Sequence, residues 1–176
     1  MRVIEDGKPA VLKDGRSVKI RRYKPSDKEG LVSMYAGLSP ESLRWSMPPY
    51  NRERIERMTS DLDNRIMVLG FDGQRVVGHL QISLATNARF RGTGELFIYL
   101  HQDFQNVGLG AALMNEGITL SKAHRVHRVE LTVVAENHRA IRLYEKVGFQ
   151  REGLKRENYL GEDGKYRDEV EMGILL

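Results

Sequence analysis

The stretch that decides the fold is Gln105-Asn106-Val107-Gly108-Leu109-Gly110-Ala111, a loop with two glycines that leads directly into an apolar segment without proline. Residues 95–100 before it are rich in aromatic and branched side chains and predict a strand. The segment after it repeats apolar residues over about three turns and predicts a helix. A strand, a glycine loop and a helix in this order are typical of an anion site, because the first N–H groups of a helix have no internal partner.

The two glycines narrow the choice of ligand. Gly108 and Gly110 lack a Cβ atom, so the main chain can approach a phosphate closely, and we expect a ligand with a phosphate or pyrophosphate. A dinucleotide fingerprint fits poorly, because its third glycine position holds Leu113 and no acidic residue ends a second strand at the required distance. A P-loop is excluded because no Gly-Lys-Ser/Thr follows.

Composition excludes several classes of protein. No apolar run approaches the roughly 18 residues of a membrane span, and the charged N-terminus lacks the apolar core of a signal peptide, so we expect a cytoplasmic protein with no membrane partner. The chain has no cysteine, which removes disulfides, cysteine-based zinc sites and an acyl-cysteine intermediate. The net charge of +4 is not concentrated on a basic face with aromatic residues, so nucleic acid is not an expected partner.

Hydrophobic periodicity and turn signals predict an α+β domain with a mixed sheet. We expect strands at about 18–23, 65–71, 75–85, 95–100, 129–134, 149–159 and 165–174, and a hairpin turn at Asp14-Gly15. Helices are expected from a cap at Ser26 to about Leu38, from Pro40, from Asn51, after the glycine loop and from Asn137 to Val147.

Two local patterns in the first half of the chain carry specific expectations. Residues 26–29 have the form of a capping box, in which Ser26 accepts from the Glu29 N–H and Glu29 reaches back. Arg52, Arg54 and Arg57 lie off the apolar stripe of the helix that begins at Asn51. A solvated helix surface is the favoured interpretation of these arginines over a ligand cluster.

A second motif lies about 30 residues after the glycine loop. It reads Asn137-x-x-Ala140-x-x-Leu143-Tyr144-x-x-x-Gly148-Phe149 and follows the strand expected at 129–134. It closely resembles the strand-Asn-x-x-Ala-x-x-Leu-Tyr-x-x-x-Gly-Phe segment of the GCN5-related N-acetyltransferase (GNAT) family. The block Gln105-x-x-Gly108-x-Gly110 resembles the acetyl-CoA loop of the same family, Arg/Gln-x-x-Gly-x-Gly/Ala. The resemblance covers about residues 17–175, so we expect one GNAT domain over residues 1–176.

The resemblance implies a mostly antiparallel sheet with a splayed parallel pair, flanked by helices, and acetyl-CoA as co-substrate without a metal. The pantetheine arm is expected to enter the gap between the splayed strands. It would lie beside the strand at 95–101, with the thioester lined by Phe97, Ile98, Tyr99 and Leu100. The pyrophosphate is expected on the main-chain N–H groups of Gln105, Asn106, Val107, Gly108, Leu109, Gly110 and Ala111.

The resemblance also suggests which residues move protons. It implies that Tyr144 protonates the departing CoA thiolate and that Asn137 contacts the cofactor; the alternatives are a core tyrosine and an ordinary helix N-cap. The attacking amine must be neutral, and Glu95 is our candidate general base, acting through water, unless it is an ordinary strand-end glutamate. We expect the oxyanion to meet a main-chain N–H near Ile98 or Tyr99. The histidines show no metal-ligand spacing.

The amine acceptor is less constrained. Residues 39–44 with the strand and helix before them look like acetyltransferase modules that modify protein lysines. The runs at 148–153 and 164–168 are similar to ribosomal-protein N-terminal acetyltransferases and polyamine acetyltransferases. Our first hypothesis is direct acetyl transfer to a primary amine, preferably a protein lysine or N-terminal amine. A polyamine or other small-molecule amine is the alternative, and a non-catalytic acyl-CoA-binding regulatory module is the competing class. A homodimer is a further expectation.

Overall fold

Eight strands form one sheet in the computed structural model, which describes residues 7–176, and their order is β1-β2-β3-β4-β5-β6-β8-β7. All neighbouring strands pair antiparallel except β5 and β6, which are parallel. This confirms the mixed α+β fold expected from the sequence. The strands are β1 (Lys8–Val11), β2 (Ser17–Arg22), β3 (Arg65–Asp72), β4 (Arg75–Leu84), β5 (Thr93–Leu100), β6 (Arg128–Val134), β7 (Gln150–Leu160) and β8 (Tyr166–Leu175).

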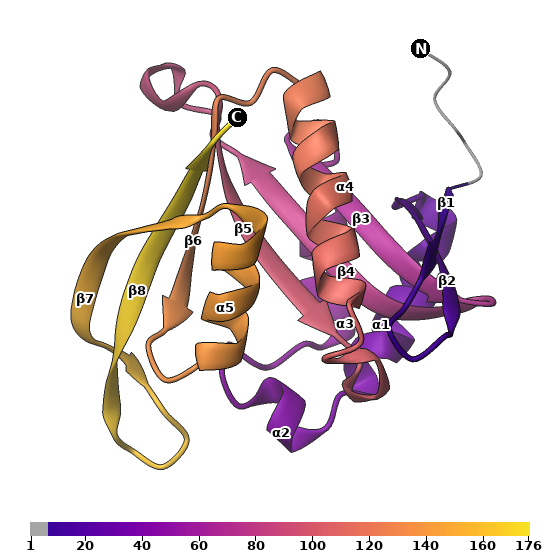
Figure 1. Ribbon diagram of the computed structural model, residues 1–176, viewed down its shortest axis with the longest axis horizontal. Coiled ribbons are helices and arrows are strands. Elements are labelled where there is room, and N and C mark those ends of the chain that lie inside the picture. The colour runs from indigo at the N-terminus through magenta and orange to yellow at the C-terminus, as the bar shows by residue number, and fades with distance from the viewer. Residues whose placement is uncertain (1–6) are drawn as a thin grey trace.

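Helices cover both faces of the sheet (Figure 1). They are α1 (Lys28–Ala36), α2 (Pro40–Leu43), α3 (Arg52–Thr59), α4 (Leu109–Ala123) and α5 (His138–Val147). One core cluster packs α4 and α5 against the sheet, through residues such as Leu113 and Ile141. A second cluster packs α1 and α3 against the other face, through residues such as Leu31 and Ile55. The central strands β3 and β4 are buried on both faces and are correspondingly apolar.

Side chains cap three of the helix starts. The side chains of Ser39, Asn51 and Asn137 accept from main-chain N–H groups three residues later, at 3.2, 3.0 and 3.2 Å. Each cap satisfies an N–H group that has no partner within its own helix. Gly148 has φ 114°, the left-handed conformation expected of a residue that ends α5.

The expected capping box at residues 26–29 is wrong. A 3₁₀ turn, Pro25–Asp27, precedes α1, and the Asp27 carboxylate accepts from the Lys24 N–H at 2.7 Å. Arg21 of β2 holds this carboxylate with two hydrogen bonds of 2.7 Å, while Glu29 pairs with Arg52 of α3. The partly buried ion pair between Arg21 and Asp27 therefore explains why Asp27, and not Glu29, accepts the main-chain hydrogen bond at this turn.

The strands β5 and β6 separate after a short parallel ladder. Their pairs are Thr93 with Arg128, Gly94 with Val129 and Glu95 with Glu130, after which the strands diverge (Figure 1). On the other side of β5, the His101 N–H donates to the Val77 carbonyl at 2.9 Å. The alternation of an antiparallel ladder then directs the main-chain groups of Leu96, Ile98 and Leu100 away from β4 and into the gap.

Candidate active site

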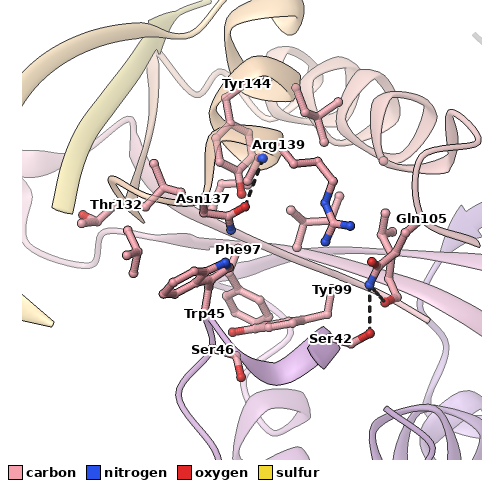
Figure 2. A pocket seen from close by; sticks show the side chains of 18 of the residues that line it. Ser42, Trp45, Ser46, Phe97, Tyr99, Gln105, Thr132, Asn137, Arg139 and Tyr144 are labelled. Atoms are coloured by element: carbon pink, nitrogen blue, oxygen red, sulfur yellow. Dashed lines mark hydrogen bonds between the residues drawn. The ribbon is translucent and has the colours of Figure 1, made fainter. Parts of the chain in front are cut away.

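A cavity of about 840 Å³ occupies the gap between β5 and β6 and extends along the glycine loop and α5. Eleven of the thirteen residues expected to bind the cofactor line this cavity. Glu95, the candidate general base, lines it as well. Figure 2 shows that α5, β5 and the segment around α2 all contribute side chains to it. The lining residues that the sequence predicted are Glu95, Phe97, Ile98, Tyr99, Leu100, Gln105, Asn106, Gly108, Gly110, Ala111, Asn137 and Tyr144.

Gly108 lies where the glycine loop turns into α4. It is the N-cap of α4 with φ 98°, a left-handed conformation that side chains rarely adopt, and a Cβ atom there would meet only the Lys13 side chain, at 3.7 Å. No side chain in the described part of the chain caps this helix. The N–H groups of its first turn are therefore available to an anion in the cavity.

Gly110 lines the cavity and also allows two helices to pack closely. A Cβ atom at this position would lie 2.9 Å from Cδ2 of Leu143, so the missing side chain allows α4 to pack closely against α5. Leu109 is fully buried in the core, and Val107 packs against that core with its carbonyl accepting from the Lys13 N–H. Of Val107 and Leu109, only the main-chain N–H groups are therefore candidates for contact with a ligand.

The side chain of Gln105 braces the loop. Its Nε2 donates to the Ser42 hydroxyl at 3.1 Å and to the Leu100 carbonyl at 3.2 Å (Figure 2). The Ser39 N–H in turn donates to Gln102 Oε1 at 3.1 Å. These bonds hold α2 beside the glycine loop. Ser42 was missing from the sequence-based set, because nothing local in the sequence shows that α2 lies there.

Tyr144 reaches into the cavity from α5. Its ring extends toward the side chains contributed by β5 (Figure 2), and only 8% of the residue is exposed. Burial raises the pKa of its hydroxyl to about 12, so the phenol stays protonated at neutral pH. Two turns earlier in the motif, Asn137 uses its Oδ1 atom as the α5 cap, and its amide NH₂ remains a donor.

Glu95 lies where the parallel ladder ends. It is exposed and lines the cavity, and strand alternation places it on the same face of β5 as Phe97 and Tyr99. This face is opposite the one that packs against α4 and α5. A carboxylate at this position can accept a proton from a group that enters the gap from the α1 and α3 side.

An aromatic cluster forms the floor of the cavity on that side. The Tyr35 and Tyr50 rings stack with centroids 4.8 Å apart, and the Tyr50 hydroxyl donates to the Tyr99 hydroxyl. The Tyr35 hydroxyl lies 2.8 Å from Nδ1 of His79, which is fully buried. Burial raises the pKa values of Tyr35 and Tyr99 well above their usual range and lowers the pKa of His79 to about 3. Tyr35, Tyr99 and His79 are therefore neutral at physiological pH.

The segment after α2 closes over the cavity and is tied to β7. The Tyr159 hydroxyl donates to the carbonyls of Arg44, at 3.2 Å, and Ser46, at 3.0 Å. Between them, the Trp45 ring centre lies 5.4 Å from the guanidinium of Arg167, which is itself held by Asp163 and Glu136. These contacts bridge two segments more than 110 residues apart.

Arg54 departs from the interpretation of a solvated helix surface. Its guanidinium lies 4.5 Å from the Tyr50 ring centre, and it lines the cavity while donating to the carbonyls of Met47 and Pro49. Arg52 and Arg57 do pair with acidic residues on the surface, Glu29 and Glu53. Arg54 differs because the segment 44–50 folds back over its face of α3.

Within residues 7–176, no group of three or more histidine, cysteine or acidic residues is placed to hold a metal ion. None of the helices described there is long and apolar enough to cross a membrane.

The chain resembles known acetyltransferases in sequence and in structure. Residues 31–149 match the model of the acetyltransferase (GNAT) family. An L-amino acid N-acetyltransferase of Escherichia coli is 35% identical over 114 residues, which cover 64% of this chain and 69% of that protein. A GNAT-family acetyltransferase from Streptococcus pneumoniae, at 30% identity, superposes with a TM-score of 0.79 over 90% of this chain and 99% of that chain.

One structure with the same fold was solved in complex with acetyl-CoA. A phosphinothricin acetyltransferase from Sinorhizobium meliloti, solved with acetyl-CoA, shares the fold at 21% identity with a TM-score of 0.78, over 90% of this chain and 88% of that chain. The splayed strands, the glycine loop and the family match agree with one another. This chain belongs to the acetyltransferase (GNAT) family and is an acetyl-CoA-dependent N-acetyltransferase.

Proposed function

We propose that this enzyme transfers an acetyl group directly from acetyl-CoA to a small primary amine, without a covalent enzyme intermediate. The observation that carries the proposal is the position of Tyr144, a protonated phenol that reaches from α5 into the gap between β5 and β6. The chain has no cysteine to form an acyl-enzyme. A direct transfer needs only a bound thioester, a neutral amine and groups that accept and return one proton.

The gap and the loop fit the parts of acetyl-CoA. The N–H groups of residues 105–111 suit its pyrophosphate, because charge-assisted hydrogen bonds from a helix N-terminus favour an anion. Phe97, Ile98, Tyr99 and Leu100 line the gap where the thioester belongs. Of the two candidates for the oxyanion donor, Ile98 is favoured, since the Tyr99 main chain pairs with His79 of β4.

Three proton transfers complete the reaction. Glu95 takes a proton from the ammonium form of the acceptor, directly or through water, leaves a neutral amine, and later releases this proton to solvent. The amine nitrogen then bonds to the acetyl carbon as the C–S bond breaks. Tyr144 gives its proton to the sulfur that leaves, and the proton lost by the nitrogen restores the phenol through solvent. Asn137 has an amide donor in the same cavity and is a candidate contact for the cofactor.

A small acceptor fits the enclosure better than a protein does. Tyr50 and Tyr99 form one wall of the acceptor side of the cavity. Residues 44–46, which the Tyr159 hydroxyl binds to β7, cover it. Arg54 is a cation in this half of the cavity and could face a carboxylate. The relative at 35% identity is named for L-amino acids, which carry both an amine and a carboxylate. The expectation of a protein lysine or N-terminal amine receives no such support.

The test is release of free CoA from acetyl-CoA in the presence of L-amino acids, polyamines, lysine peptides and N-terminal peptides. Turnover confined to small amines, and lost in Tyr144→Phe, is the expected result. Turnover of peptides alone would instead favour a protein lysine or N-terminal amine as the acceptor. Binding of acetyl-CoA with no turnover on a widened amine panel would instead favour the non-catalytic acyl-CoA-binding module.

A further inference from the structure

The N-terminal hairpin is fastened to the glycine loop. In the turn between β1 and β2, the Lys13 N–H donates to the Val107 carbonyl at 2.9 Å. Three residues on, Arg16 donates to the Asp103 carbonyl at 2.6 Å, and its guanidinium lies 4.0 Å from the centre of the Phe104 ring. Two separate contacts therefore hold this turn against the segment that leads into α4.

The side chain of Lys13 lies over Gly108. Its Cγ is 3.7 Å from the position that a Cβ of Gly108 would occupy, and the residue lines the cavity. Neighbouring charges on the hairpin are already paired: Lys8 binds Glu116 at 2.7 Å, and Asp14 binds Arg16 at 2.6 Å. Within residues 7–176, Lys13 forms no ion pair, so its ammonium group remains available to a ligand in the cavity.

Helix α5 supplies more positive charge along the same cavity. Arg139, Arg142 and Lys146 are spaced three and four residues apart, so they share one face of the helix, and all three line the cavity. No ion pair involves them in the described part of the chain. Figure 2 shows the Arg139 side chain extending into the cavity. The end of the cavity near the glycine loop is therefore rich in cations without acidic partners.

We propose that Lys13 binds a phosphate group of CoA, which makes the N-terminal hairpin part of the cofactor site. The turn that carries Lys13 precedes the residues that match the family model, which begin at 31, and it lies before the core expected from the sequence, at 17–175. The ligand chemistry is a phosphate monoester or diester, because CoA carries a 3′-phosphate as well as its pyrophosphate. The proposal rests on the placement of the cofactor at residues 105–111.

The test is calorimetric titration of CoA and of 3′-dephospho-CoA into the full-length protein and three variants. Lys13→Met keeps the aliphatic stem and removes the charge, while Lys13→Arg keeps the charge. Lys19→Met is the matched control, since Lys19 is an exposed lysine on the same hairpin that does not line the cavity. We expect Lys13→Met to raise the Kd for CoA about three- to tenfold, with Lys13→Arg and Lys19→Met close to the parent protein.

The second ligand identifies the phosphate. A loss confined to CoA assigns Lys13 to the 3′-phosphate, and an equal loss for both ligands assigns it to the pyrophosphate. An unchanged Kd for both ligands in Lys13→Met overturns the proposal, as does a loss that Lys13→Arg fails to restore. Gly108→Glu separates this outcome from failure of the cofactor site itself. If Gly108→Glu abolishes CoA binding while Lys13→Met does not alter it, only the role of Lys13 is wrong.

Discussion

Glu95 of β5 and Glu130 of β6 form the last pair of the parallel ladder, and the cavity begins where their pairing ends. The two carboxylates have different surroundings: Glu130 binds Arg128 at 3.0 Å, whereas Glu95 lines the cavity. The point at which the strands separate therefore leaves at the cavity one carboxylate that forms no ion pair within residues 7–176. This relationship makes Glu95 the better candidate for the general base.

Glu95→Gln should lower kcat by about 10²- to 10⁴-fold near neutral pH, because an amide cannot accept the ammonium proton. The loss should shrink as the assay pH approaches the pKa of the acceptor amine, since the amine then loses its proton without help. Steady-state kinetics as a function of pH measure both effects, with Glu130→Gln as the matched control. A loss in Glu95→Gln that stays constant with pH would argue against the role of base.

Tyr144→Phe should lower kcat by about 10²- to 10⁴-fold while leaving the affinity for CoA nearly unchanged. The substitution keeps the ring and its contact with Phe149, whose centroid lies 6.1 Å away, and removes only the hydroxyl. Turnover and CoA titration should be measured together, with Tyr166→Phe as control because Tyr166 is 63% exposed. Turnover equal to that of the parent protein would leave Tyr144 as a core residue.

Gly108→Glu should abolish CoA binding. The substitution adds a side chain at φ 98° and a negative charge at the start of α4, where the pyrophosphate is placed. Gly73→Glu is the matched control, because Gly73 also has positive φ, at 58°, but lies in the turn between β3 and β4. CoA titration and thermal unfolding of both variants separate loss of the site from backbone strain. Retained CoA affinity in Gly108→Glu would refute the loop assignment.

His79 should make stability depend on acidic pH. Its folded pKa is about 3, below the usual 6.5 of an unfolded histidine, so only the unfolded chain binds a proton between these values. The contribution of His79 to the free energy of unfolding should therefore be at its full value above pH 6.5. It should fall by at most about 5 kcal/mol as the pH drops toward 3. His79→Gln should flatten that fall, whereas His124→Gln, at an exposed position, should not.

Denaturant unfolding at several pH values measures this dependence. Because acidic groups such as Asp27 also lose their ion pairs on acidification, the informative quantity is the difference between parent and variant. Identical pH profiles for His79→Gln and the parent protein would show that the buried imidazole does not control acid stability.

The order of the elements and most of their limits could be read from local patterns. The caps at Ser39, Asn51 and Asn137 and the left-handed glycines at 108 and 148 work through bonds within a few residues. Local hydrogen bonds and φ restrictions leave a signature in a short window of sequence. The glycine loop and the motif around Tyr144 predicted the cofactor side of the site for the same reason.

Tertiary structure alone decided which other residues line the cavity beside the glycine loop. Lys13, Arg54 and Tyr159 come from three distant segments that no local pattern brings together. Tertiary contacts also explain why Asp27, and not Glu29, accepts the main-chain hydrogen bond before α1. They likewise explain the close packing of α4 against α5 at Gly110. The sequence by itself determined the elements and the chemistry they carry, because these depend on neighbouring residues. The sheet order determined which elements meet, because strand pairing acts between residues far apart in the chain.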